Sequence, residues 1–136
     1  MPTRRHHRGI ILVVDDNDDV RENVVECLEA KGFGCWSAAS ADEALDLVAR
    51  QGAAPAAVVT DLTMPGMDVE TFLAALESDE ETADVPVLVM TGACERDWPA
   101  WVDPESVLEK PFTVPQLFRA VAHAVSTRRA DVAAAA

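Results

Sequence analysis

Short apolar runs alternate with longer segments of helical periodicity along the chain, and this alternation is the strongest constraint on its fold. The first run, Ile10–Val14, is aliphatic throughout and shows no polar alternation, which is typical of a strand buried on both faces. Strands that alternate with helices form a parallel sheet with helices on both faces, so we predict a doubly wound α/β fold. The predicted strands are residues 10–14, 33–38, 56–60, 85–90 and 106–108.

Helix boundaries are marked by capping residues and by proline. Ser40 is a good N-cap, and Glu43 three residues later is its capping-box partner, so a helix is predicted to begin here. The segment 93–103 is different, because Pro99 and Pro104 limit any helix that forms in it. The fourth helix is therefore predicted to be short.

Length and composition set the domain organisation and exclude two classes of protein. A chain of 136 residues predicts one domain, which we place at 9–127, between disordered tails at 1–8 and 128–136. A net charge of −13 repels phosphate backbones, so no direct nucleic-acid binding is expected. No membrane insertion is expected either, because the apolar runs fall far short of the roughly 20 residues that span a bilayer. Three cysteines, an odd and sparse number, favour a reducing, cytoplasmic location.

Polar residues of complementary types stand where the predicted strands end. Asp15 and Asp16 follow the first strand, Asp61 the third, Thr91 the fourth and Lys110 the fifth. Ligands in open sheets of this class gather beyond the carboxyl ends of the strands. Carboxylates about 4 Å apart repel each other by about 1 kcal/mol in water and about 4 kcal/mol at an effective dielectric constant of 20, so this cluster needs a cation or a raised pKa.

These residue types suit phosphoryl transfer to a carboxylate. Carboxylate oxygens with open water positions are the ligands that Mg²⁺ prefers. Lys110 can grip an incoming oxyanion, and Thr91 offers it one hydroxyl donor. A carboxylate can itself act as the nucleophile and form an acyl phosphate, a reaction that needs positioning and charge neutralisation.

Four segments together resemble the receiver domain of two-component response regulators. They are ILVVDDNDDVREN, VVTDLTMPGMDVETF, VPVLVMTG and VLEKPF, in this order, and the similarity extends from about residue 10 to about residue 125. The resemblance implies a flavodoxin-like sheet with strand order 2-1-3-4-5. It also implies a signalling module rather than an enzyme.

The resemblance further assigns roles around the acceptor. Asp61 accepts a phosphoryl group from a sensor histidine kinase or a histidine phosphotransfer protein. Mg²⁺ is held by Asp61, by Asp16 directly, by Asp15 partly through water, and by the backbone carbonyl of Thr63.

Two further roles follow from the same resemblance. Thr91 moves toward the phosphoryl oxygen and reports its arrival, and Lys110 binds that oxygen. The Lys110–Pro111 peptide bond is expected to be cis, which is otherwise found in only about 5–6% of such bonds in folded proteins.

The chain departs from the family pattern in two places. The family carries an aromatic residue three positions before the lysine, and this chain has Val107 there. The segment between Thr91 and Lys110 is also short, so the fourth helix of the family is expected to be abbreviated. Trp98 and Trp101 lie in this segment and are candidates for partner contacts, although ordinary packing explains them equally well.

Three functions remain open at this stage. The first is a stand-alone regulator that signals to a downstream protein, because little chain follows Lys110 to form a DNA-binding output domain. The second is a haloacid dehalogenase-like phosphatase, with Asp16 as nucleophile and Asp18 as acid/base, which leaves Asp61 unexplained. The third is a degenerate receiver that binds partners without being phosphorylated.

Overall fold

The chain folds into one five-stranded parallel sheet with the strand order β2-β1-β3-β4-β5. The computed structural model describes the backbone of residues 8–64 and 66–135, and side chains up to residue 127. The predicted order of a doubly wound, flavodoxin-like sheet is confirmed, and each predicted strand overlaps the observed one to within two residues at either end. The strands are β1 (Ile10–Val14), β2 (Gly34–Ala38), β3 (Ala57–Asp61), β4 (Val87–Thr91) and β5 (Val107–Glu109).

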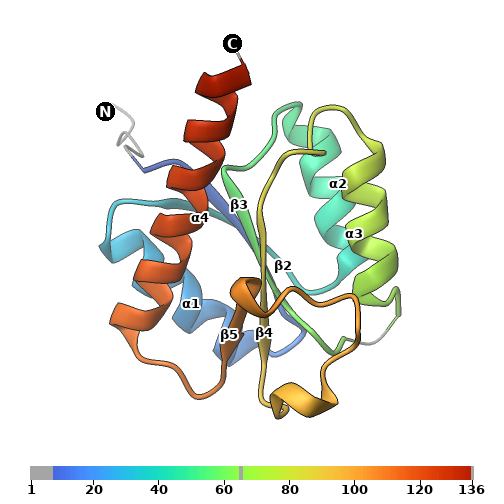
Figure 1. Cartoon of the computed structure of the whole chain (residues 1–136), viewed down its shortest axis with the longest axis vertical. Helices are drawn as coiled ribbons and strands as arrows, with labels where there is room; N and C mark the ends of the chain where they lie inside the picture. The colour runs from blue at the N-terminus through green and yellow to red at the C-terminus, as the bar shows by residue number, and fades with distance from the viewer. Residues whose placement is uncertain (1–7, 65, 136) are drawn as a thin grey trace.

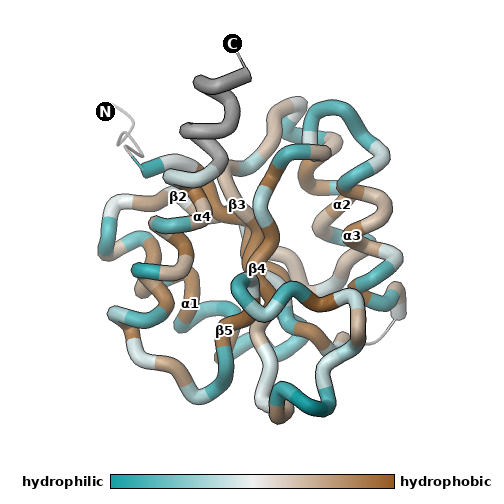
Figure 2. Tube along the Cα trace, viewed as in Figure 1, coloured by the Kyte–Doolittle hydropathy of each residue, from teal (hydrophilic) through white to brown (hydrophobic). Residues whose placement is uncertain are grey.

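Two pairs of α-helices cover the two faces of the sheet (Figure 1). The helices α1 (Asp18–Ala30) and α4 (Val114–Ala135) pack on one face. The helices α2 (Ala41–Gln51) and α3 (Val69–Ser78) pack on the other. This three-layer arrangement buries both faces of the central strands, which Figure 2 shows as the brown interior of the trace.

The first strand shows why its sequence has no polar alternation. Ile11 and Val13 belong to the core cluster under α1 and α4. Leu12 and Val14 belong to the cluster under α2 and α3. All four side chains are fully buried, because successive residues of a strand point to opposite faces and both faces are covered.

The helix α2 begins at the predicted cap, Ser40. The Ser40 side chain accepts a hydrogen bond from the Glu43 backbone N–H at 3.1 Å, as the capping motif predicts. The Glu43 carboxylate reaches back to the N–H of Ala39 at 3.3 Å, one residue before the cap itself. At α1 the cap is Asn17, whose side chain accepts from the N–H of Val20 at 3.1 Å. This cap fixes the start of α1 directly after the acidic pair that follows β1.

Two elements differ from the predictions. Within the described residues, the segment between β4 and β5 contains no α-helix, only the 3₁₀ turns η1 (Glu95–Asp97) and η2 (Pro104–Ser106). Proline lacks the N–H that continues a helix, which explains why the expected short helix does not form. The last helix is longer than predicted, since α4 continues to Ala135 through the alanine-rich segment that we expected to be a disordered tail. Alanine has the highest helix propensity of all residues.

Two other expectations can be compared with the structure only in part. Most of the predicted N-terminal tail, residues 1–7, lies outside the described residues. Among the residues that the structure does describe, no helix is long and apolar enough to cross a membrane.

We expect Gly9→Ala to lower the free energy of unfolding by about 1–2 kcal/mol, because Gly9 has a φ of +102° that side chains disfavour. The added Cβ would also lie 2.9 Å from the Cβ of Ala56 at the start of β3. Urea denaturation followed by circular dichroism measures the loss. Gly92→Ala is the matched control, since its Cβ meets nothing within 4 Å. Equal stability of the two variants would contradict the prediction.

Candidate functional site

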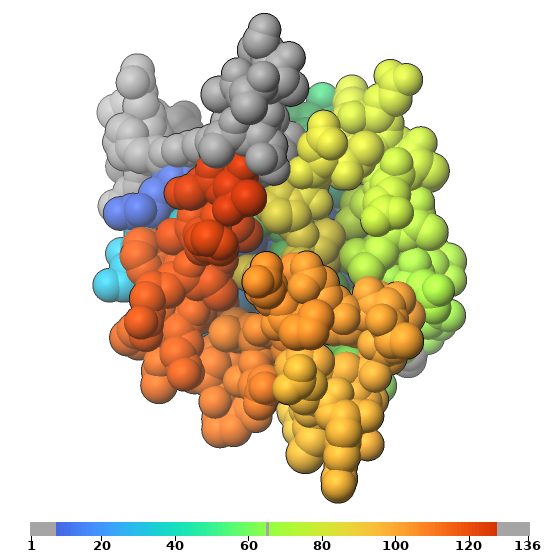
Figure 3. All heavy atoms as spheres, in the orientation of Figure 1, coloured from blue at the N-terminus to red at the C-terminus, as the bar shows by residue number. Residues whose placement is uncertain are grey.

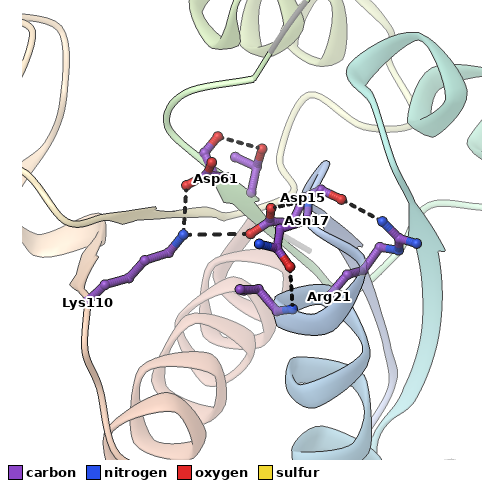
Figure 4. Close-up of polar contacts among 7 residues, drawn as sticks. Asp15, Asn17, Arg21, Asp61 and Lys110 are labelled. Carbon is purple, nitrogen blue, oxygen red and sulfur yellow. Dashed lines mark hydrogen bonds and ion pairs between the residues drawn. The ribbon is translucent and has the colours of Figure 1, made fainter.

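The structure brings the predicted polar residues to one edge of the sheet. Asp15 directly follows β1, Asp61 is the last residue of β3, Thr91 is the last residue of β4, and Lys110 directly follows β5. Because all the strands are parallel, their carboxyl ends lie at the same edge. Figure 4 shows Asp15, Asp61 and Lys110 pointing toward one another from three different segments.

Lys110 bridges two of the carboxylates. Its Nζ lies 3.1 Å from Oδ1 of Asp61 and donates a hydrogen bond to it. The same Nζ lies 3.7 Å from Oδ2 of Asp15. The backbone N–H of Lys110 donates to the carbonyl of Thr91 at 2.7 Å, and the Lys110–Pro111 peptide bond is cis, as expected. The ammonium group therefore neutralises part of the negative charge that the strand ends bring together.

Three carboxylates converge in a way that suits a divalent cation. Oxygens of Asp15, Asp16 and Asp61 all lie within 4.8 Å of one another. Asp15 is 1% exposed, and its Oδ2 has no hydrogen-bond partner among the described residues. Its other oxygen accepts from the N–H of Asn17 at 2.9 Å. A buried carboxylate oxygen without a donor is costly, and a hard cation such as Mg²⁺ would satisfy it. The donor set thus fits the predicted ion.

The pKa of the Asp61 carboxyl is raised above its ordinary value. Burial is the largest cause, and the negative charges of Asp15 and Asp16 add to it. The hydrogen bond and positive charge of Lys110 act in the opposite direction, without cancelling the effect of burial. A bound cation would favour the ionised carboxylate, which is the form that can act as a nucleophile.

The side chains of Thr91 and Thr63 make no described contact with the three carboxylates or with the Lys110 ammonium group. Thr91 is buried, and its Oγ1 accepts a hydrogen bond from the N–H of Ala93 at 3.0 Å. Asp61 pairs with Met90 in the register of β3 and β4, so Thr91 lies one residue beyond it on the neighbouring strand. Thr63 is exposed, two residues after Asp61. The metal-binding role of its carbonyl remains a prediction.

Arg21 is a supporting residue that the sequence analysis missed. Its guanidinium donates to the backbone carbonyl of Asp15 at 2.7 Å (Figure 4). It also donates to the carboxylate of Asp18 at 2.6 Å. The first turn of α1 is thereby tied to the loop that carries the acidic pair. The spacing of Asp18 and Arg21 by three residues was a signal for a helix ion pair, but it did not indicate the contact with Asp15.

An apolar cavity of about 420 Å³ lies beside the site, between α1 and the beginning of α4. Lys110 and Pro111 line the edge nearest the carboxylates. Val114 is 43% exposed, which is unusual for a large apolar side chain in this molecule. The remaining lining residues are Val20, Asn23, Val24, Cys27, Phe112 and Leu117.

We expect Asp15→Asn to raise the free energy of unfolding by about 1 kcal/mol in buffer that contains a chelator. The neutral amide keeps an oxygen for the N–H of Asn17, while the repulsion from Asp16 and Asp61 disappears. The variant also loses the attraction between Asp15 and Lys110. This loss offsets only part of the gain, because Asp15 is attracted by one ammonium group and repelled by two carboxylates. Urea denaturation measures the change.

Asp46→Asn, on the exposed side of α2, is the control for removing one negative charge, and it should change stability by less than about 0.5 kcal/mol. Destabilisation by Asp15→Asn would mean that the contact with Lys110 outweighs the repulsion.

Comparison with known proteins gives one consistent family. A family profile described as the response regulator receiver domain matches residues 11–122. The chain is 36% identical over 110 residues to the response regulator MprA of Mycobacterium sp. (strain KMS), covering 79% of this chain and 46% of MprA. It is 35% identical over 112 residues to the sensor kinase CckA of Brucella abortus (strain 2308), covering 79% of this chain and 11% of CckA.

A solved structure gives the same result. A response regulator receiver domain protein from Clostridium thermocellum superimposes with a TM-score of 0.78 at 26% sequence identity, covering 89% of this chain and 97% of that one. The chain spans less than half the length of the two curated relatives. The matches therefore concern this domain rather than the activities of those whole proteins.

Proposed function

The chain belongs to the family of response regulator receiver domains, and on that premise we propose that Asp61 accepts a phosphoryl group in a Mg²⁺-dependent reaction. The donor is a phosphohistidine on a sensor histidine kinase or a histidine phosphotransfer protein. Receiver domains are signalling modules that interact with histidine kinases and downstream effectors, and the chain acts in this proposal as a switch rather than as a turnover enzyme.

One observation carries the proposal. The Asp61 carboxylate lies 3.1 Å from a lysine ammonium and within 4.8 Å of two further carboxylates, one of which has a buried oxygen without a hydrogen-bond partner. A nucleophilic oxygen, a group that binds an oxyanion and a cation site thus meet at one point. A carboxyl group whose pKa is raised, as that of Asp61 is, and that lies in such a cluster favours a functional site over a solvated loop edge.

Each residue of the site has a separate role in the proposed phosphoryl transfer. An oxygen of Asp61 forms a bond to phosphorus while the phosphorus–nitrogen bond of the donor breaks, and the electron pair of that bond returns to the imidazole. Lys110 holds a phosphoryl oxygen, and the hydroxyl of Thr91 donates to another. Asp15, Asp16, Asp61 and the carbonyl of Thr63 would hold Mg²⁺, which supplies charge neutralisation at the transferring group.

Access to the acceptor supports transfer from a macromolecular donor. Asp61 is half-buried, and Asp16 beside it is exposed, so the site opens to the surface. The apolar cavity between α1 and α4 begins at Lys110, next to the acceptor. A donor protein that brings its histidine to Asp61 can rest an apolar side chain in this cavity.

The direct test is labelling with a small phosphodonor. We expect incubation with acetyl phosphate and Mg²⁺, followed by peptide mapping, to place the phosphoryl group on Asp61, and a chelator to prevent the labelling. Label on Asp16 would instead support the haloacid dehalogenase-like phosphatase. No label, together with no Mg²⁺ binding in a titration, would support the degenerate receiver.

The phosphatase alternative has little support from the surroundings of Asp18. That reaction needs the Asp18 carboxylate as a mobile acid/base, and here it is paired with Arg21 at 2.6 Å. The alternative also gives no role to Asp61, although Asp61 is one of the three carboxylates of the cluster and binds Lys110. The degenerate receiver remains a candidate because Val107 occupies the position of the usual aromatic residue.

Output through a downstream protein completes the proposal. Stand-alone action remains a prediction. A cytoplasmic location and the absence of direct nucleic-acid binding also remain predictions, which rest on the cysteine content and on the net charge of −13. Electrophoretic mobility assays with mixed-sequence DNA test the absence of nucleic-acid binding, and pull-down experiments with candidate kinases test the proposed phosphoryl donor.

A further inference from the structure

A chain of two hydrogen bonds connects Thr91 to an indole ring. Thr91 Oγ1 accepts from the backbone N–H of Ala93 at 3.0 Å. The carbonyl of the same Ala93 accepts from Nε1–H of Trp98 at 3.0 Å. One residue of the backbone therefore binds both the hydroxyl at the end of β4 and the side chain of a tryptophan five residues further on.

The segment around Ala93 has little else to hold it in place. Residues 92–97 are exposed, and Trp98 is the first residue after Thr91 that is partly buried. Figure 3 shows the segment as the golden protrusion at the lower edge of the molecule. A Cβ added to Gly92 would meet nothing within 4 Å, so no neighbouring side chain packs against this side of Gly92. A small displacement of Ala93 can thus occur without disturbing the core.

Val107 occupies the position, three residues before Lys110, where the family carries an aromatic side chain. Val107 is a strand residue that pairs with Val89 of β4 and has no ring. Trp98 is an aromatic residue connected by described hydrogen bonds to Thr91. Trp101, the other aromatic residue of the segment, is 36% exposed.

We propose that Trp98 reports the phosphorylation state of Asp61 through Ala93 and Thr91; this inference rests on the proposed function. In its bond with Ala93 the Thr91 oxygen is the acceptor, so the hydroxyl proton is available for a new acceptor. An acyl phosphate on the neighbouring strand brings such acceptors, with a charge of roughly −1.5 to −2. When the hydroxyl turns toward them, the N–H of Ala93 loses its acceptor and follows it.

The movement of Ala93 carries its carbonyl away from the Trp98 indole. The N–H of Trp98 then changes its hydrogen bond, and the surface formed by η1 and the two tryptophans changes with it. Trp98 is a positioning residue in this scheme, because it acts on the partner surface and touches neither the acceptor nor the phosphoryl group.

Indole NMR resonances test the inference. The protein has three tryptophans, so a sample labelled with ¹⁵N-tryptophan gives three indole signals, which Trp36→Phe, Trp98→Phe and Trp101→Phe assign. Beryllofluoride with Mg²⁺ serves as the probe, since it binds a carboxylate oxygen in place of a phosphoryl group. Its bound fluorine signal, recorded on the same sample, reports occupancy independently of the tryptophans.

We expect the Trp98 indole signal to shift on saturation with beryllofluoride by more than that of Trp36 or Trp101. Thr91→Val, which removes the hydroxyl at nearly constant volume, should abolish that shift at saturating probe, and Thr91→Ser should restore it. Trp98→Phe should leave the rate of Asp61 labelling by acetyl phosphate unchanged, which separates the readout from the chemistry.

Two outcomes would overturn the inference alone, and a third would overturn the proposed function with it. A bound fluorine signal with an unmoved Trp98 resonance would mean that no relay exists. An equal Trp98 shift in Thr91→Val would mean that the probe acts on the indole without the hydroxyl. The absence of any bound fluorine signal from the wild-type protein would contradict phosphoryl acceptance by Asp61 and therefore both proposals.

Discussion

Asp61→Asn is expected to reduce phosphoryl labelling by acetyl phosphate and Mg²⁺ at least about a hundredfold, because an amide oxygen is a poor nucleophile and forms no stable acyl phosphate. The amide has nearly the same size as the carboxyl group. Its oxygen, at the end of β3, can still accept the hydrogen bond from Lys110. The fold should therefore survive. Radiolabel incorporation or intact-protein mass spectrometry measures the loss.

Asp46→Asn is the control for that experiment, since it makes the same chemical change on the exposed side of α2. It should be labelled like the wild-type protein. Circular dichroism and urea denaturation of both variants verify that the fold is intact. Labelling of Asp61→Asn at the wild-type level would move the acceptor to another residue and remove the basis of the proposed function.

Asp16→Ala is expected to weaken Mg²⁺ binding by at least about tenfold. Loss of an outer-shell partner already costs about 10–100-fold in metal affinity, and loss of a direct ligand costs no less. Asp16 is exposed while Asp15 is buried, so Asp16 can be truncated without opening a hole in the core. Isothermal titration calorimetry with MgCl₂ measures the dissociation constant.

Asp19→Ala is the matched control, because Asp19 is an exposed aspartate in the first turn of α1 and is not part of the carboxylate cluster. It removes the same charge a few residues away and should change Mg²⁺ affinity only slightly at physiological salt. Equal losses in both variants would show that Asp16 acts through the general negative potential rather than as a ligand.

Removal of Asp61 and removal of Asp16 should therefore have different consequences. The first leaves a protein that still binds Mg²⁺ weakly but has no acceptor. The second leaves the acceptor and Lys110 at 3.1 Å, so slow labelling should persist at high Mg²⁺ concentration. If the two variants had the same labelling rate and the same Mg²⁺ affinity, the site would be organised differently from the one described.

Most of the fold followed from local patterns. The apolar runs, the Ser40 cap and the alternation of strands with helices are properties of short segments, and the parallel sheet follows from their order. Predictions were wrong where helix formation depends on a balance of small free-energy contributions from single residues. Pro99 and Pro104 left only 3₁₀ turns, and a run of alanines carried α4 to Ala135. The sequence shows the abundance of alanine in this segment, but it does not show whether the alanines extend the helix or form a disordered tail.

For the candidate site, the sequence determined which residue types stand at the ends of the strands, because strand order and direction fix where those ends meet. It did not determine the contacts. The 3.1 Å approach of Lys110 to Asp61, the unpartnered oxygen of Asp15 and the support from Arg21 depend on how strands and helices pack against each other. The path from Thr91 through Ala93 to Trp98 has the same origin, since a loop without a helical repeat takes its hydrogen bonds from the structure around it.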